Sequence, residues 1–549
     1  MRLSRSILTV VLGAPLLAVA GWAFARALEA PPASPDRQGP RVTTVSAVQR
    51  RSLAGANEIA ARYVGAGGCA AAACHGDASS ANSPSWKNSY SRWIGQRDPH
   101  SIAYSVLKSE TSKRILWLLD GGQGDPQAEK NQPWSNAAPH RDNRCLTCHS
   151  ITPDAHTQLP ESLLADGVSC EGCHGPADSW IASHTTVGWL ADGAKRYQFV
   201  GQGAGVGRDN RAATADARMR NTKDPVSRAN LCVRCHVGGP DRDVNHDLIA
   251  AGHPRLNFEY HAFMANLPRH WNDELDRERL QIEPQSTAAK PADYEARLWA
   301  IGQAASAQAA LQLLEQRVNR TVQTQPAQLP EEIASERGWR HGAIAPAWPE
   351  LAEYSCYACH HDIKGPRITS SDPQTRRRPL GSLPWGTWYF SEVQSKLFSA
   401  EGAGLPALGA MVEPVRKAME KPVAQPKEVA AQLLGDGDST ATQRSRPYQK
   451  RVALADVERW LAALSELPPP ESWDEATQRY LALNALTKSH RKLAGQYAKL
   501  DYGAIERDLE EIRKRLQFEP GYQSPGHLNF DGLKQLHERL FKVRELLQP

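Results

Sequence analysis

The stretch Cys170-Glu171-Gly172-Cys173-His174 has counterparts at four other places in this chain of 549 residues. All ten cysteines belong to such pairs, and a histidine directly follows each pair. Four of the five stretches have the pattern C-x-x-C-H, whereas the first has four residues between its cysteines. The other four are Cys69–Cys74–His75, Cys145–Cys148–His149, Cys232–Cys235–His236 and Cys356–Cys359–His360. No cysteine lies outside these five stretches, so all the cysteines have the same local setting.

The pattern C-x-x-C-H is the attachment site of c-type haem, in which two thiols bond the porphyrin edge and the histidine binds the iron. We therefore predict five covalently attached haem c groups with their iron, held by the ten cysteines and ligated by the five following histidines. Disulfides and zinc ribbons are the alternatives, but neither requires a histidine after every second cysteine. Only the separation of Cys148 from Cys170 approaches the spacing of a zinc ribbon.

The composition fits a fold built round cofactors. Hydrophobic residues make up only 41% of the chain, which also contains 38 prolines and 40 glycines, so the side-chain core is thin for this length. Buried porphyrins would supply the missing apolar surface. We predict a mainly α fold: a multihaem cytochrome c region of short helices and long loops wrapped round haems, followed by a C-terminal α-helical bundle.

The net charge gives no support to nucleic-acid binding. The formal value is +5, and residues 1–25 contribute Arg2 and Arg5 without any acidic residue, so their removal leaves +3. Two propionates on each haem outweigh the iron–porphyrin charge, so five haems add about −5 to −10 and bring the total to roughly −2 to −7. We therefore expect redox proteins as partners and no nucleic acid.

The N-terminus has the pattern of an export segment. Arg2 and Arg5 precede an apolar run from Ile7 to Ala25, which ends in the small-residue pattern Ala23-Phe24-Ala25. We predict a signal peptide or N-terminal membrane anchor over residues 1–27, since the run is also about as long as a minimal membrane span. The protein is then exported or periplasmic, or is held at the membrane by residues 7–25.

The rest of the chain divides by composition. We predict a linker over 28–60, the pentahaem domain over 61–365, a second linker over 366–399 and an α-helical domain over 400–549. Inside the haem domain, apolar residues from Asp293 to Val318 recur at helical spacing and indicate a bracing helix. Gly175-Pro176 predicts a short helix that ends near His184.

The C-terminal region has the signals of several amphipathic helices. Ser472 and Glu475 form a capping-box pattern, and a triple proline at 468–470 ends the preceding helix. Apolar stripes recur at helical spacing further on, and helices with such stripes bury them against one another. His490, His527 and His537 are expected at the surface. This bundle is also our hypothesis for a module that docks the protein to a partner.

Each haem iron has a second axial position, which histidine or methionine can fill. Histidine is the more abundant of the two, because the chain has 18 histidines and only five methionines. Asp98-Pro99-His100 places a capping residue and proline before a histidine, which fixes it in a first helical turn. His184 lies too few residues after His174 to reach round the same haem and is expected to serve another iron. Our second-face ligands are His100, His184, His246 and His253.

Two stretches resemble the cytochrome c-554 family. One runs from Cys69 to His75 and is followed by Trp86 and by Asp98-Pro99-His100-Ser101-Ile102-Ala103-Tyr104. The other is Gly167-Val168-Ser169-Cys170-Glu171-Gly172-Cys173-His174-Gly175-Pro176, followed by His184. The resemblance spans about residues 63–260. The stretched first motif, the fifth haem motif and the helical C-terminal region depart from that family's pattern.

The resemblance implies particular iron pairings. His184 would bind the iron of His75, and His100 the iron of His174. The haem of His149 would be the candidate for an open or differently ligated face, which His140 could also fill.

Two functions compete on these grounds. A chain of closely spaced haems with two histidines on each iron is typical of an electron-transfer protein, and we expect this role, with no catalytic residue. The alternative is an oxidoreductase that acts on a small nitrogen or sulfur compound at one five-coordinate haem. The choice turns on the His149 haem.

Overall fold

A computed structural model describes the parts of the chain that position the site. The described residues are 62–78, 86–95, 98–122, 132–154, 156–178, 180–185, 219–222, 224–239, 241–268, 292–323, 348–356, 381–391, 406–434, 451–470, 472–495, 500–518 and 530–546. The chain divides into compact units over 1–52 and 53–549, and all described residues lie in the second. The predicted export segment, the first linker, Cys359 and His360 fall outside the described residues.

The mainly α prediction is confirmed. The described residues form helices, and their only β structure is two isolated bridges, Gly239 with Arg242 and Tyr354 with Trp385. None of the helices within these ranges has the length and apolar character needed to cross a bilayer.

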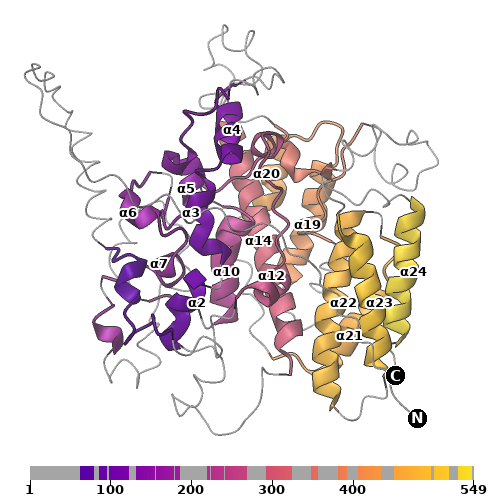
Figure 1. The fold of residues 1–549 in the computed structure, drawn as a ribbon. Helices are drawn as coiled ribbons and strands as arrows, with labels where there is room; N and C mark the ends of the chain where they lie inside the picture. Colours follow the sequence, from indigo (N-terminus) through magenta and orange to yellow (C-terminus); the bar gives the residue numbers. More distant parts are fainter. Residues whose placement is uncertain are drawn as a thin grey trace, which may run out of the picture. The chain divides into compact units, whose positions relative to one another are not determined.

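The region of the first four motifs consists of short helices joined by loops (Figure 1). Asp98, Asp142, Asp224 and Asn245 begin four of these helices, each with a side-chain oxygen that accepts a hydrogen bond from a backbone N–H of the first turn. The elements are η1 Ala66–Cys69, η2 Trp86–Asn88, α2 Ser89–Gly95, η3 Pro99–Ile102, α3 Ala103–Val106, α4 Glu110–Leu119, η5 Pro139–Arg141, α5 Asn143–His149, α6 Glu161–Leu164, α7 Cys170–His174, η6 Ser183–Thr185, α10 Pro225–His236, α11 His246–Ala250 and α12 Tyr260–Asn266.

The bracing helix is longer and more deeply buried than its stripe predicted. α14 spans Tyr294–Gln323 and packs against α10 and α12 as well as against α20 and α22. Leu298, Ile301 and Leu311 are buried as expected, but Trp299 and Ala300, which lie off that stripe, are buried too. A helix with neighbours on several sides is buried on more than one face, and α14 also buries polar side chains, among them Gln303, Ser306 and Arg317.

The C-terminal region is helical as predicted, and its long helices run side by side (Figure 1). Ser472 caps α22 by accepting a hydrogen bond from the Glu475 N–H, as its pattern predicted. The expectation for His490 was wrong: this side chain is buried, and its Nδ1 lies 2.8 Å from the Tyr502 hydroxyl. The helices are α19 Pro406–Met419, α20 Pro426–Leu434, α21 Leu454–Ser465, α22 Trp473–Ala494, α23 Tyr502–Leu516 and α24 Phe530–Leu546.

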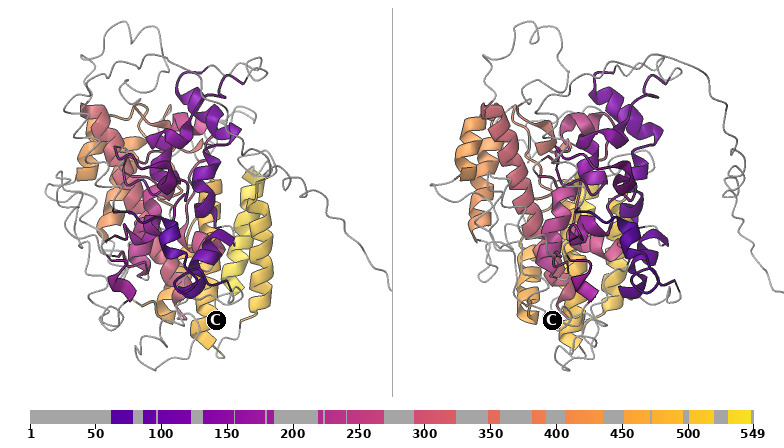
Figure 2. Two further views of the ribbon diagram at one scale, coloured as in Figure 1. Left: turned by 60° about the vertical axis from the view of Figure 1, so that its left-hand side comes forward. Right: turned by 90° about the vertical axis from the view of Figure 1, so that its left-hand side faces the viewer.

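One apolar core joins the later motifs to the C-terminal helices. It runs through the sequence from Val226 on α10 to Val543 on α24, and α14 supplies many of its members. In Figure 2 the orange helices α19 and α20 stand beside the rose helix α14. A second, smaller core of Tyr104, Leu107, Leu146 and their neighbours lies at the second motif. The predicted linker over 366–399 between the haem domain and the C-terminal domain stays a prediction.

Candidate functional site

The described haem motifs lie on or beside short helices. α5 ends at His149, α7 at His174 and α10 at His236, each the last residue of a C-x-x-C-H pattern. Residues three and four apart lie on one face of a helix, so both sulfurs and the imidazole of such a motif face the same way. The nine described cysteines are free of disulfides, which leaves their thiols available for thioether bonds.

The first motif has a different backbone from the others. The 3-10 helix η1 ends at Cys69, and a turn over 72–75 brings Cys74 round, with its N–H donating to the Ala71 carbonyl at 2.8 Å. The two additional residues between these cysteines are therefore accommodated by the turn.

Three pairs of histidine rings face each other at nearly one separation. The ring centres are 6.3 Å apart for His75 and His184, 6.0 Å for His100 and His236, and 6.4 Å for His149 and His253. A metal–imidazole bond is about 2 Å long and the ring centre lies about 1 Å beyond the nitrogen, so two imidazoles on one iron have centres about 6 Å apart. The planes meet at 11°, 90° and 86°. Rotation about the nitrogen–iron–nitrogen axis leaves the separation unchanged, so all three pairs fit.

Hydrogen bonds hold five of these rings by one nitrogen. In each case Nδ1 lies within reach of an oxygen: Ser89 Oγ for His75, Asp98 Oδ1 for His100, the Ala103 carbonyl for His149, the Ile181 carbonyl for His184 and the Pro254 carbonyl for His253. An Nδ1–H that donates to such an acceptor fixes the tautomer and the ring orientation, which leaves Nε2 as the metal-binding nitrogen. This arrangement fits bis-histidine haem.

Burial keeps several of the rings neutral. It lowers the pKa of His236 to about 4, and also lowers the pKa of His149 and of His253. Neutral imidazole is the form that binds a metal, so these surroundings favour iron ligation over protonation.

Glu171 lies inside the third motif and ties it to the first. Its carboxylate accepts hydrogen bonds from the N–H groups of Val64 at 3.1 Å, Gly65 at 2.8 Å and Ala177 at 2.8 Å, and the side chain is buried. No role for Glu171 was predicted from the sequence, although an acidic residue inside a C-x-x-C-H pattern could have indicated one. The helix predicted from Pro176 to His184 is formed only in part: the Ile181 N–H donates to the Ala177 carbonyl at 2.8 Å and the His184 N–H to the Trp180 carbonyl at 2.9 Å, but among the described residues there only η6 is assigned as a helix.

Arg242 makes the corresponding link between the second and fourth motifs. Its buried guanidinium donates to the carbonyls of Thr147 at 3.0 Å and Pro153 at 2.8 Å, which flank the end of α5. The Thr147 hydroxyl donates to the Asp241 carbonyl at 3.2 Å. Because Arg242 follows α10 closely in sequence, the two motifs are fixed relative to each other. Nothing in the sequence pattern singled this arginine out.

The thiols show which motifs adjoin. The thiol of Cys69 is close enough to that of Cys170 to shift its pKa, and the same holds for Cys148 and Cys235. Burial raises the pKa of Cys173 to about 11, against Arg220, and the nearby Asp98 and Cys235 add to the rise. Haem attachment would convert these sulfurs into thioethers, which removes the thiol protons and leaves the sulfurs close together. The first motif therefore lies beside the third and the second beside the fourth, and Cys173 of the third lies near Cys235 of the fourth.

The remaining histidine candidates occupy different settings. His140 has its ring 6.3 Å from that of Tyr104, and burial lowers its pKa. His246 begins α11 and donates its backbone N–H to Glu350 at 2.8 Å. His261 is buried with Nε2 at 2.9 Å from Glu295, a carboxylate that occupies its ligating nitrogen.

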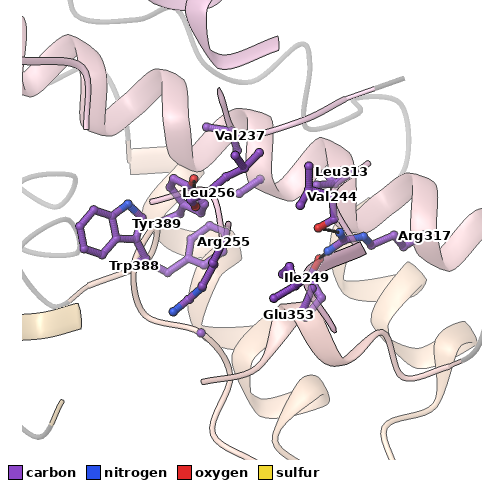
Figure 3. Close-up of a pocket in the computed structure, with 14 residues that line it drawn as sticks. Val237, Val244, Ile249, Arg255, Leu256, Leu313, Arg317, Glu353, Trp388 and Tyr389 are labelled. Atoms are coloured by element: carbon purple, nitrogen blue, oxygen red, sulfur yellow. Dashed lines mark hydrogen bonds and ion pairs between the residues drawn. The ribbon is translucent and has the colours of Figure 1, made fainter. Parts of the chain in front are cut away.

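A pocket lies between α11, α14 and residues 386–390, with a cavity volume of about 70 Å³ and about 580 Å³ when the adjoining open solvent is included. Its lining includes the apolar side chains Val237, Val244, Ile249, Leu313 and Trp388 and the charged groups Arg255, Arg317 and Glu353. Figure 3 shows Trp388 and Tyr389 at one end and Arg317 with Glu353 at the other. The pocket borders the fourth motif through Val237 and the fifth through Glu353.

Opposed histidine rings beside C-x-x-C-H helices define a multihaem c-type cytochrome, whose cofactor is covalently bound haem c with its iron and whose role is electron transfer. The comparison with known families agrees: residues 69–175 match the family described as cytochrome c554 and c-prime, which this chain resembles. No curated protein and no solved structure matches the chain.

The ring pairs differ in part from the pairings that the resemblance implied. His184 faces His75, as implied. His100 faces His236, whereas the resemblance assigned it to His174. His149, the implied open position, has the ring of His253 opposite.

Proposed function

We propose that this protein is an exported pentahaem cytochrome that passes electrons along a chain of mostly bis-histidine haems. The observation that carries the proposal is the common separation of 6.0 to 6.4 Å in three histidine pairs. Two imidazoles on one iron leave no coordination position for a substrate, so the metal can change its oxidation state but binds nothing else. Redox proteins are the proposed donor and acceptor, with membrane association through the N-terminus as a further proposal.

The order of the motifs supports a route for the electrons. Cys69 lies beside Cys170 and Cys235 beside Cys148, and Cys173 is near enough to Cys235 for its charge to act on the Cys173 thiol. Because the thioether sulfurs sit at the porphyrin edges, haems anchored at adjoining cysteines have their edges close together. The proposed route therefore runs from the first haem through the third and fourth to the second, which is not the order of the motifs in the sequence.

The second haem favours the carrier over the enzyme. An enzyme of the alternative type needs an open face on the iron of His149. The ring of His253 lies 6.4 Å from that of His149, and its Nδ1 is held by the Pro254 carbonyl at 2.8 Å. With Nδ1 held in this way, Nε2 of His253 is the nitrogen left to bind the iron at the face that a substrate would require.

The pocket and His246 support a place for the fifth haem. Val244 and Ile249, which flank His246, line the pocket together with Glu353, which precedes Cys356 by three residues. The apolar side chains in its wall suit a porphyrin. We propose His246 as the second-face ligand there.

Haem content and spin state test the proposal together. Pyridine haemochrome spectroscopy and intact mass are expected to give five haems per chain. Electron paramagnetic resonance of the oxidised protein is expected to show low-spin ferric haem throughout. A count of four would remove the stretched first site or the fifth site from the proposal, and a strong high-spin signal would favour the enzyme.

A further inference from the structure

Asp98 holds His100 by two hydrogen bonds to one oxygen. Its Oδ1 accepts from the His100 backbone N–H at 2.9 Å and lies 2.9 Å from Nδ1 of the same residue. The Asp98 side chain is only 10% exposed, so water screens this contact weakly. The carboxylate is also the N-cap of η3, whose first residue is Pro99. The chain entering this helix and the ring of His100 are thus fixed by the same atom.

This contact differs in charge from the other four contacts of the same kind. Ser89 Oγ meets Nδ1 of His75, and backbone carbonyls meet Nδ1 of His149, His184 and His253. These four partners are neutral, whereas the Nδ1 contact of His100 is with a carboxylate. A carboxylate that accepts the Nδ1–H makes imidazole a more basic ligand, and a negative charge beside the site favours the more positive metal.

We propose that Asp98 is a positioning residue that sets the reduction potential of the haem ligated by His100. It holds the ring with Nε2 toward the iron and its charge stabilises the ferric state, which lowers the potential of that haem. This inference rests on the proposed function, in which His100 is an iron ligand. Because His100 faces His236 of the fourth motif, the lowered potential falls at an interior step of the proposed route.

The test removes the negative charge of Asp98 and keeps its hydrogen bonds. Asn at position 98 can still cap η3 and accept the Nδ1–H, because both residue types are good N-caps with a side-chain oxygen. In a spectropotentiometric titration of the haem-loaded protein, Asp98→Asn is expected to favour reduction of one haem about tenfold, an upward shift of about 59 mV for a one-electron couple. The other midpoints are expected to stay unchanged.

The chain contains a matched control for this substitution. Asp154 accepts the N–H of His156 at 2.8 Å, also two residues on, but the described structure has no hydrogen bond from the ring of His156 to that carboxylate. Asp154→Asn is therefore expected to shift no midpoint. If Asp98→Asn shifts none either, or lowers one, the inference is overturned.

A second variant separates this inference from the function on which it rests. His100→Ala is expected to change the spin state of one haem, as seen by electron paramagnetic resonance, with five haems still attached by mass. If His100→Ala leaves every signal unchanged, His100 is not a ligand and the proposed pairing fails. If it alters one haem while Asp98→Asn shifts no potential, the pairing stands and only the role of Asp98 is refuted.

Discussion

In the His184→Ala protein one haem is expected to change from low-spin to high-spin, with the others unaltered. His184 supplies the ring that faces His75, with centres 6.3 Å apart and planes only 11° from parallel. Alanine carries no ligating group, so the iron of His75 would lose its second imidazole. Electron paramagnetic resonance would show a new high-spin ferric signal that accounts for one haem in five, and the reduced protein would acquire the capacity to bind carbon monoxide.

Two further variants make this test specific. His184→Met is expected to keep the haem low-spin and raise its potential, because thioether in place of imidazole favours the reduced iron. His156→Ala, at an exposed position outside the proposed ligand set, is expected to change neither spin state nor potential. A His184→Ala protein with only low-spin haem would show that His184 is not the ligand opposite His75.

Replacing Arg317 by methionine is expected to lower the free energy of unfolding by about 3–5 kcal/mol, the typical cost of breaking a buried ion pair from one side. Arg317 is 7% exposed and lies 2.6 Å from both Asp243 and Glu353, which are 19% and 9% exposed. Methionine fills a similar volume but leaves two carboxylates without this cation. Guanidinium denaturation followed by far-ultraviolet circular dichroism measures the loss.

Arg320 provides the matched control, because it contacts the other oxygen of Asp243 at the same distance of 2.6 Å but is 51% exposed. Arg320→Met is therefore expected to cost no more than about 1 kcal/mol. A comparable loss in the two variants would contradict the assignment of Arg317 as the central cation.

The loss in Arg317→Met is expected to depend on pH. Burial would raise the pKa of Asp243, but Arg317 and Arg320 together lower it, and burial raises the pKa of Glu353 despite Arg317. Without Arg317 both pKa values rise, so the folded variant binds protons more readily than the unfolded chain and gains stability as the pH falls. The difference from the unaltered protein should thus be smaller near about pH 5 than at neutral pH.

Local signals in the sequence were sufficient for the caps, the stripes and the haem motifs. Asp98 and Pro99 predicted the start of η3, and Ser472 predicted the start of α22, because a cap depends on residues within one turn. The burial of His490 against Tyr502 was not predictable in this way, since the partner belongs to a different helix.

Local sequence signals could not predict which histidine rings face each other. His100 and His236 are far apart in sequence, and so are His149 and His253, and the resemblance to a known family gave a different partner for the first and none for the second. The clamps formed by Glu171 and Arg242 act over similar separations. The sequence shows that Glu171 is an acceptor and Arg242 a donor. Which backbone N–H and carbonyl groups they bind depends on the folded backbone.

The sequence by itself determined that this is a multihaem c-type cytochrome of mainly α structure, because thioether attachment requires two cysteines and a histidine at fixed local spacing. Only the tertiary structure decided which rings face each other and which motifs adjoin. The second ligand of each iron is the histidine whose ring folding places about 6 Å from the ring of the first. The role of Asp98 depends on both the sequence and the tertiary structure. Its position two residues before His100 is fixed by the sequence, but the haem that it affects depends on which ring faces His100.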